Sequence, residues 1–315
     1  MHDMTDMDAD PPSIERVLVV GYGVMGRGIA QTFGAGGFDT VVWSRRAAAL
    51  TDLPPLVRAV DRLPDAAPDL VIESVLEDVA VKQQVYHAIE AAYTASVIIG
   101  TNSSGLPLET LGATLAHPER FVGTHYFMPA EVFPMVEVMA GLHTPRAVVD
   151  RVAAAMRRTG KDAVTLYKPI TGYLINRLQH CILHEAYHLI ETGVASPAEI
   201  DRVARLMLGP RMCVNGLIEQ KDIGGLEIHG NAQRAIVPAL EHSGVPNRYL
   251  QALLKRGETG IDAGKGFFDW SGCDPKAVRR QTVTRLNALL DFLQTGLGET
   301  VERTTPKQRP VEPAE

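Results

Sequence analysis

The sequence lacks several features that would place it in a specialised class of protein. It has no apolar run of the roughly 18 residues that span a bilayer, and its acidic start, MHDMTDMDADPP, does not resemble a signal peptide. It has no basic block, and its 31 Lys and Arg against 37 Asp and Glu give a formal net charge of −6. We therefore expect a cytoplasmic protein that binds neither a membrane nor nucleic acid.

Cysteine is also scarce. Cys181, Cys213 and Cys273 are widely spaced, odd in number and without a CxxC pair, so neither a disulfide framework nor a zinc cluster is expected. We interpret the three cysteines as small buried apolar residues. His184 and His188 are four residues apart in a helical pattern but have no evident third ligand, and no metal site is predicted.

What is present is an ordinary globular composition, 45% hydrophobic over 315 residues, which suits two domains of about 150 residues each. Residues 14–168 alternate helical patterns with runs rich in Val and Ile, typical of strands buried on both faces. The runs are RVLVV (16–20), TVVW (40–43), DLVIES (69–74), SVIIG (96–100), RFVGTHYF (120–127), MVEVM (135–139) and AVTLY (163–167). This alternation predicts an α/β domain with a Rossmann-like, mostly parallel sheet.

Residues 169–296 have helical spacing throughout, which predicts an all-α C-terminal domain. Lys168-Pro169 marks the boundary because the residue before a proline disfavours helix. Flexible tails are expected at 1–13 and 299–315.

Two helix starts in this region have clear signals. Ser196-Pro197-Ala198-Glu199 is a capping box with proline at the first helical position, and Gly209 is expected to end the helix that follows. Asp274-Pro275 is expected to start the last helix of the domain.

A glycine-rich loop follows the first predicted strand and opens a helix. Gly21 permits the tight turn, Gly23 lets the backbone approach a pyrophosphate, and Gly26 lets the helix pack on the strand. The unpaired N–H groups of the loop, with those of Val24 and Met25, would then face the pyrophosphate at the positive end of the helix dipole. The alternative is a turn that needs small residues for packing alone.

The residues after the second strand indicate which dinucleotide binds. An NAD enzyme usually has Asp or Glu there to bond the ribose 2′-hydroxyl, whereas this chain has Ser44, Arg45 and Arg46. A hydroxyl and two guanidiniums suit the 2′-phosphate of NADP, which a carboxylate would repel. The sequence therefore predicts NADP(H), with NAD(H) as the alternative if both arginines are simply solvated.

A histidine and a glutamate are candidates for acid–base chemistry. His125 lies at the end of a predicted parallel strand, where ligands of such sheets bind, and Glu137 lies among apolar residues in the next strand. A buried carboxylate needs a partner, and His125 is the simplest one. Such a pair can take the proton of a hydroxyl while hydride leaves the same carbon; the alternative is a hydrogen-bonded structural histidine.

At this point the chain resembles the 3-hydroxyacyl-CoA dehydrogenases over roughly 16–270. The resemblance is carried by the order and spacing of several segments together. They are GYGVMGRGIA (21–30), VIESVLEDVAVKQQV (71–85), TNSSGLPLE (101–109), RFVGTHYFMPA (120–130), MVEV (135–138), GYLINRL (172–178), HEAYHLIETGVASPAEIDRV (184–203) and GIDAGKGFFDW (260–270).

The resemblance implies roles for individual residues. His125 and Glu137 match the family's catalytic dyad, Ser104 the serine that hydrogen-bonds the substrate oxygen, and Asn176 the asparagine that helps polarise the carbonyl. Ser104 as a helix cap and Asn176 as a helix-start hydrogen bonder are the structural alternatives.

The same resemblance implies the surroundings of the reaction. Glu77 and Lys82 match a pair on the nicotinamide side, and Asn102 lies beside the cofactor. The implied architecture is a Rossmann-like domain and a helical domain that forms a homodimer, with a small-molecule substrate in the cleft between them.

The chain departs from the family at more than the ribose acid. Met128 stands where the family has Asn before Pro, which predicts a more apolar pocket there. Residues 45–70 are much shorter than the segment that carries a CoA-binding helical arm in relatives, and leave room for one short helix at most. A CoA thioester and a free 3-hydroxy acid are therefore almost equal as substrates, with the 3-hydroxyacyl reaction slightly favoured. A dinucleotide-binding sensor without turnover is the third hypothesis.

Overall fold

The structure is a computed structural model that describes residues 13–51, 53–93, 97–296 and 306–307. The tails expected at 1–13 and 299–315 therefore lie outside the described residues, apart from Ser13, Pro306 and Lys307. The chain divides into two units, 1–178 and 179–315, which are described separately.

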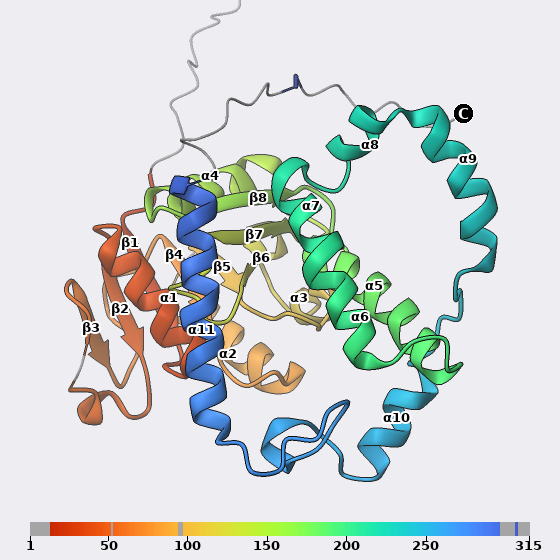
Figure 1. The fold of residues 1–315 in the computed structure, drawn as a ribbon. Coiled ribbons are helices and arrows are strands. Elements are labelled where there is room, and N and C mark those ends of the chain that lie inside the picture. The colour runs from red at the N-terminus through yellow and green to blue at the C-terminus, as the bar shows by residue number, and fades with distance from the viewer. Residues whose placement is uncertain (1–12, 52, 94–96, 297–305, 308–315) are drawn as a thin grey trace, which may run out of the picture. The chain divides into compact units, whose positions relative to one another are not determined.

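The first unit is built on a sheet with the strand order β3-β2-β1-β4-β5-β6-β7-β8, as traced in Figure 1. The strands are β1 (Arg16–Val20), β2 (Asp39–Trp43), β3 (Val57–Val60), β4 (Leu70–Glu73), β5 (Ile98–Thr101), β6 (Phe121–Tyr126), β7 (Met135–Ala140) and β8 (Asp162–Leu166). All neighbours are parallel except β6 and β7. The prediction of a Rossmann-like, mostly parallel sheet is confirmed.

Helices cover both faces of this sheet because its strands are apolar on both. Alternate residues of β1 point to opposite sides: Val17 and Val19 join the core under two helices, and Leu18 and Val20 join the core under the other two. The first core takes buried side chains from α1 (Val24–Ala35) and α4 (Arg146–Arg158), the second from α2 (Val79–Ala92) and α3 (Leu108–Gly112). The loops after β1, β2, β4 and β5 follow the carboxyl ends of parallel strands, where ligands of such sheets bind.

The short segment 45–70 contains a strand that the sequence did not predict. A 3₁₀ turn (η1, Ala47–Ala49) leads to β3, which pairs in parallel with β2 at the edge of the sheet. Pro54-Pro55 immediately before β3 disfavours helix, and the four residues VRAV are too short to stand out as a strand. The expectation of at most one short helix here holds for the described residues.

The second unit is helical, as predicted. Together with the end of α5 (Tyr173–Glu191), it contains α6 (Pro197–Val203), α7 (Gly209–Asn215), α8 (Glu219–Gly224), α9 (Leu226–Ile236), α10 (Arg248–Lys255) and α11 (Pro275–Asp291). The capping box before α6 is present with both of its hydrogen bonds, and Asp274 caps α11. Across the described residues, no helix has both the length and the apolarity to cross a membrane.

One helix end was predicted wrongly. Gly209 does not stop the helix of α6; the chain passes through a π-helical turn (η3, Ala204–Leu208) directly into α7. Pro210 in the first turn of α7 explains the widened turn, because proline has no N–H to donate and its ring crowds the carbonyl four residues back. The result is one long helical rod with a bulge in place of a helix and a turn.

The expectation of buried cysteines is also wrong. Cys181 on α5, Cys213 on α7 and Cys273 before α11 are all exposed free thiols. Most residues of α5, α7 and the turn before α11 are exposed or only partly buried, so a small apolar residue there is not drawn into a core. Residue type predicts burial only where a neighbouring element covers the face.

Candidate active site

The glycine loop lies at the N-terminus of α1 and has the geometry of an anion cradle. Gly21 has a φ of +96°, and a Cβ there would come within 2.6 Å of the Ser74 carbonyl oxygen, so only glycine fits. Gly23 is the N-cap of α1 without a side-chain cap, and nothing lies within 4 Å of where its Cβ would be. The N–H groups of Val24 and Met25 follow in the first turn. This open space fits the pyrophosphate of a dinucleotide.

Ser44, Arg45 and Arg46 follow β2 at the same edge of the sheet. The Ser44 hydroxyl oxygen accepts the Arg46 N–H at 3.2 Å, which folds the segment into a tight turn. Both arginines are exposed. Basic side chains therefore stand where an acidic residue binds the ribose of NAD in related folds.

His125 and Glu137 come together as the sequence suggested. They are directly opposite each other in the antiparallel pair β6–β7, and His125 Nδ1 donates to Glu137 Oε2 over 2.8 Å. His125 is 4% exposed and Glu137 is 1% exposed. An imidazole held through Nδ1 keeps Nε2 free to accept a proton.

Glu137 also receives the N-terminus of α5. Its Oε1 accepts the backbone N–H groups of Leu174 at 2.9 Å and Ile175 at 3.1 Å. These are orphan donors of the first helical turn, and the helix dipole favours a negative charge there. This anchoring explains why the first unit extends to Leu178 and includes the start of α5, beyond the Lys168-Pro169 boundary predicted from sequence.

Tyr173, which the sequence analysis did not single out, holds the other face of the imidazole. Its ring stacks on His125 with centroids 4.6 Å apart. The residue is fully buried, and its φ of +54° lies in the left-handed region, which is costly for a side chain of this size. Its hydroxyl has no hydrogen-bond partner among the described residues, and burial raises the pKa of this phenol.

The loop after β5 contributes Asn102 and Ser104 to this edge, and α5 contributes Asn176. Asn102 Oδ1 accepts the N–H of Tyr126, the residue after His125, at 3.0 Å. Asn176 Nδ2 donates to the Ser104 carbonyl oxygen over 3.4 Å, and Ser104 is exposed. The structure therefore places Ser104, Asn176 and the His125–Glu137 dyad in one neighbourhood within the first unit.

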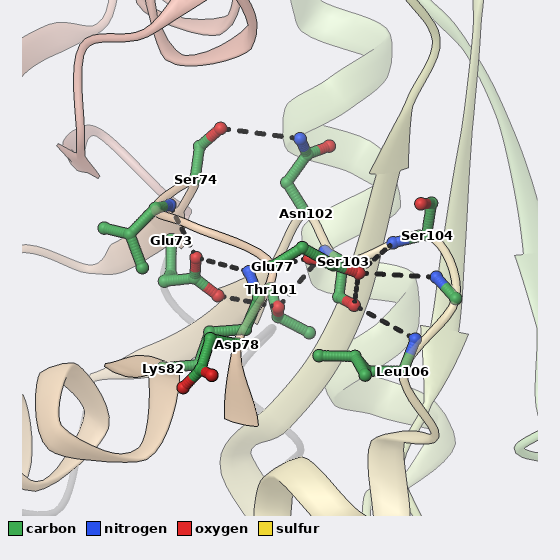
Figure 2. A network of polar contacts seen from close by, with 12 residues as sticks. Glu73, Ser74, Glu77, Asp78, Lys82, Thr101, Asn102, Ser103, Ser104 and Leu106 are labelled. Atoms are coloured by element: carbon green, nitrogen blue, oxygen red, sulfur yellow. Dashed lines mark hydrogen bonds and ion pairs between the residues drawn. The ribbon is translucent and has the colours of Figure 1, made fainter. Parts of the chain in front are cut away.

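Glu77 and Lys82 belong to a charged network seen in Figure 2. Lys82 is 1% exposed, and its ammonium contacts Glu73 at 2.7 Å and Glu77 at 3.2 Å. The Lys82 ammonium is therefore paired with carboxylates inside the protein and is not a solvent-exposed cation. Glu73 was missed by the sequence analysis, although a glutamate ending an apolar buried strand was a usable signal.

The remaining candidates from the sequence are Met128, His184 and His188. Met128 is exposed. His188 and His184 lie 3.2 and 4.0 Å from Glu241 in the second unit. Among the residues that the structure describes, no group of three or more His, Cys, Asp or Glu side chains could hold a metal ion.

The fold and the site together define a class of protein. A glycine loop with room for a pyrophosphate and a sequestered His–Glu pair in one mostly parallel sheet are the arrangement expected of a dinucleotide-dependent dehydrogenase. The chain belongs to the 3-hydroxyacyl-CoA dehydrogenase family. The family's NAD-binding domain matches residues 52–169 and its C-terminal domain matches residues 172–270. The protein is thus a dehydrogenase that acts on a CH–OH group.

Two individual relatives show which dehydrogenases the chain is similar to. The chain is 28% identical over 305 residues to 5-formyl-3-hydroxy-2-methylpyridine 4-carboxylate 5-dehydrogenase of Mesorhizobium japonicum, covering 89% of this chain and 99% of that one. It is 30% identical to L-carnitine dehydrogenase of Streptomyces coelicolor over 61% of this chain and 67% of the relative.

Two solved dehydrogenase structures are similar to this chain in fold. That of 5-formyl-3-hydroxy-2-methylpyridine 4-carboxylic acid 5-dehydrogenase, described as an NAD+-dependent dismutase, has a TM-score of 0.83 at 27% identity and covers 90% of this chain and 99% of that one. That of a 3-hydroxyacyl-CoA dehydrogenase from Archaeoglobus fulgidus has a TM-score of 0.66 at 31% identity, covering 89% and 99%.

The unpartnered hydroxyl of Tyr173 gives a stability prediction. Tyr173→Phe removes a buried polar group without a partner, which should stabilise the fold by about 1–3 kcal/mol and raise Tm in a thermal melt. Tyr86→Phe is the matched control, because that equally buried hydroxyl donates to Glu73 at 2.7 Å and its loss should lower Tm. Shifts of the same sign in both variants would contradict the assignment.

Proposed function

We propose that this dehydrogenase reversibly oxidises the hydroxyl of a small 3-hydroxy acid that is not carried on CoA, and that it prefers NADP(H). The observation that carries the reaction is the buried His125–Glu137 pair, 2.8 Å apart. The cytoplasmic location and the lack of nucleic-acid or membrane partners stay predictions from the sequence.

The chain's own groups account for the proton. His125 Nε2 removes the proton from the substrate hydroxyl, and Glu137 stabilises the resulting imidazolium through Nδ1. The dinucleotide, when bound, would supply a nicotinamide as acceptor for the hydride from the same carbon. Ser104 and Asn176 are assigned to the substrate oxygen, where donors stabilise the charge that develops as the carbonyl forms. In the reverse direction the imidazolium returns the proton.

Two observations favour a free acid over a CoA ester. The described residues of 45–70 form a 3₁₀ turn and an edge strand, with no helical arm of the kind that binds CoA in relatives. A relative matching nearly its whole length is named for a pyridine carboxylate substrate. A small carboxylated substrate, aliphatic or aromatic, suits both observations.

A substrate panel tests this proposal. Acetoacetyl-CoA, free acetoacetate and 5-formyl-3-hydroxy-2-methylpyridine 4-carboxylate are each incubated with oxidised or reduced dinucleotide, and turnover is followed at the reduced-nicotinamide absorbance. We expect kcat/KM to be higher for a free acid than for the CoA ester. His125→Gln should lower kcat by about 10²–10⁴-fold. Equal or better turnover of the CoA ester would refute the free-acid proposal.

The NADP preference rests on charge at the end of β2. Ser44, Arg45 and Arg46 replace the usual acid, and a cavity of about 460 Å³ opens beyond them. Its charged lining is mixed, with Arg58 and Arg62 beside Asp61 and Asp65, and Arg58 pairs with Asp39 at 3.4 Å. The proposal therefore rests on the exposed Arg45 and Arg46, because guanidinium groups bind phosphate oxygens through paired hydrogen bonds.

The triple substitution Ser44→Asp, Arg45→Ala and Arg46→Ala tests the preference. Loss of two charge-assisted contacts should weaken NADPH binding by about 10- to 100-fold, measured by nicotinamide fluorescence titration. NADH binding to the same variant is the internal control and should change little or improve. Unchanged NADPH affinity, or tighter NADH binding by the unsubstituted chain, would refute the preference.

We also propose that the protein is a homodimer formed through its helical unit. Many large apolar side chains of this unit are exposed in the single chain, and soluble monomers rarely expose so many together. They are Val203, Leu206, Met207, Ile218, Ile223, Leu226, Ile228 and Ile236. A second copy of the chain is the proposed cover.

Light scattering coupled to gel filtration tests the dimer. The mass should be twice the chain mass of 34.2 kDa. Ile228→Asp, at a side chain that is 72% exposed, should produce monomers. Leu142→Asp in the first unit, 66% exposed, is the matched control and should stay dimeric. A monomeric unsubstituted chain would overturn the proposal.

A further inference from the structure

We propose that Glu73 is a positioning residue for catalysis: acting through Lys82, it fixes Glu77 and thereby the loop that presents Ser104. Glu73 touches neither the dyad nor Ser104 itself. The inference rests on the proposed role of Ser104 at the substrate oxygen, and it gives a role to Glu73, which lies in the family-like segment 71–85 but has no role implied by the resemblance.

The carboxylate of Glu73 is saturated with donors. It ends β4 with no exposed surface, and Oε1 accepts the Val75 N–H at 2.7 Å and the Lys82 ammonium at 2.7 Å. Oε2 accepts the hydroxyls of Tyr86 at 2.7 Å and Thr101 at 2.8 Å. Four donors on one carboxylate leave it a single orientation, so the ammonium of Lys82 is fixed from the sheet side.

Lys82 connects the buried Glu73 to the partly exposed Glu77. Its ammonium lies between Glu73 at 2.7 Å and Glu77 at 3.2 Å. A buried lysine with two carboxylates cannot move toward either one without losing attraction to the other. The ammonium of Lys82 therefore fixes the position of the Glu77 carboxylate relative to the buried Glu73–Lys82 pair, although the Glu77 side chain is 44% exposed.

Glu77 in turn binds the loop after β5 from one side. Its Oε1 accepts the Ser103 hydroxyl in a short hydrogen bond, the Ser104 N–H at 3.2 Å and the Gly105 N–H at 3.4 Å. Partial burial raises the pKa of Glu77, but the Ser103 hydroxyl and the Lys82 ammonium outweigh it and hold the pKa below its usual range. The anionic form thus organises three consecutive residues of the loop, as Figure 2 shows.

The end of β4 also reaches the dyad by a second branch. Asn102 Nδ2 donates to the Ser74 hydroxyl at 3.5 Å, while its Oδ1 accepts the N–H of Tyr126, next to His125. Glu73 is thus connected, through Lys82 and Glu77, to the loop that carries Ser104. Its neighbour Ser74 is connected, through Asn102, to strand β6, which carries His125.

The first test measures loop order without any substrate. Glu73→Gln alone can misfold because it leaves Lys82 underpaired, so the double variant Glu73→Gln/Lys82→Met removes both buried charges together. Hydrogen–deuterium exchange of the peptide 102–108 should be at least about tenfold faster in this variant. Asp69→Asn is the matched control: it alters a carboxylate at the other end of β4 that accepts the N–H groups of Glu15 and Arg16, and loop exchange should stay at the unsubstituted rate.

The second test measures turnover with whichever substrate the unsubstituted chain accepts. The double variant should lose about 10- to 100-fold in kcat, as expected for a misplaced catalytic group, with the dinucleotide KM changed less than about threefold. Adding Glu77→Gln to the double variant should lower kcat by a smaller factor than Glu77→Gln does in the unsubstituted chain, because the effects of residues in one chain of contacts are not additive.

Loop exchange within about twofold of the unsubstituted chain, or losses that multiply on adding Glu77→Gln, would overturn the proposal. A purely structural role would lower Tm and leave the loop exchange and kcat of the folded protein unchanged, which also overturns it. The exchange measurement needs no turnover, so the positioning proposal and the proposed substrate can fail independently.

Discussion

The carboxylate of Glu137 is buried between a histidine and the first turn of a helix, and the site depends on that burial. A charge removed from water must be fully hydrogen-bonded to be tolerated. Glu137 meets this requirement with the Nδ1–H of His125 on one oxygen and the N–H groups of Leu174 and Ile175 on the other. One side chain thereby fixes the tautomer of the proposed base and fastens the start of α5 to the sheet.

Glu73 obeys the same physical rule at the end of the neighbouring strand. Its four donors come from a strand end, a loop and a helix, so satisfying one buried charge holds three elements in register. The two carboxylates divide the proposed site between them: Glu137 orients the imidazole, and Glu73, through Lys82 and Glu77, orients the Ser104 loop. Both costs of burial are offset by hydrogen bonds that also place reactive groups.

Tyr173 packs against His125 in a conformation that costs free energy. Its backbone is in the left-handed region and its hydroxyl is unpaired among the described residues, yet its ring covers one face of His125. Strain at a residue in contact with a proposed catalytic group is typical of functional sites. Here the stack confines the imidazole to the plane in which Nδ1 meets Glu137.

The sequence was most informative where local chemistry decides the outcome. The glycine loop, the apolar strands, the capping box at Ser196 and the pairing of His125 with Glu137 follow from backbone sterics, periodicity and the need of a buried charge for a partner. It was wrong about Gly209, where Pro210 widens the turn without ending the helical rod, and about the cysteines, whose burial depends on which helix faces are covered.

What only the tertiary structure decided is which distant groups converge. Glu73, Lys82 and Glu77 meet the loop at Ser103, and the first turn of α5 meets Glu137, through contacts between elements far apart in the chain. By itself the sequence determined the glycine cradle and all strands but β3, because these depend on neighbours along the chain, and it suggested the dyad, because a buried carboxylate needs a partner. The network behind them depends on packing across the sheet, and no local pattern specifies which buried donors will surround a buried carboxylate.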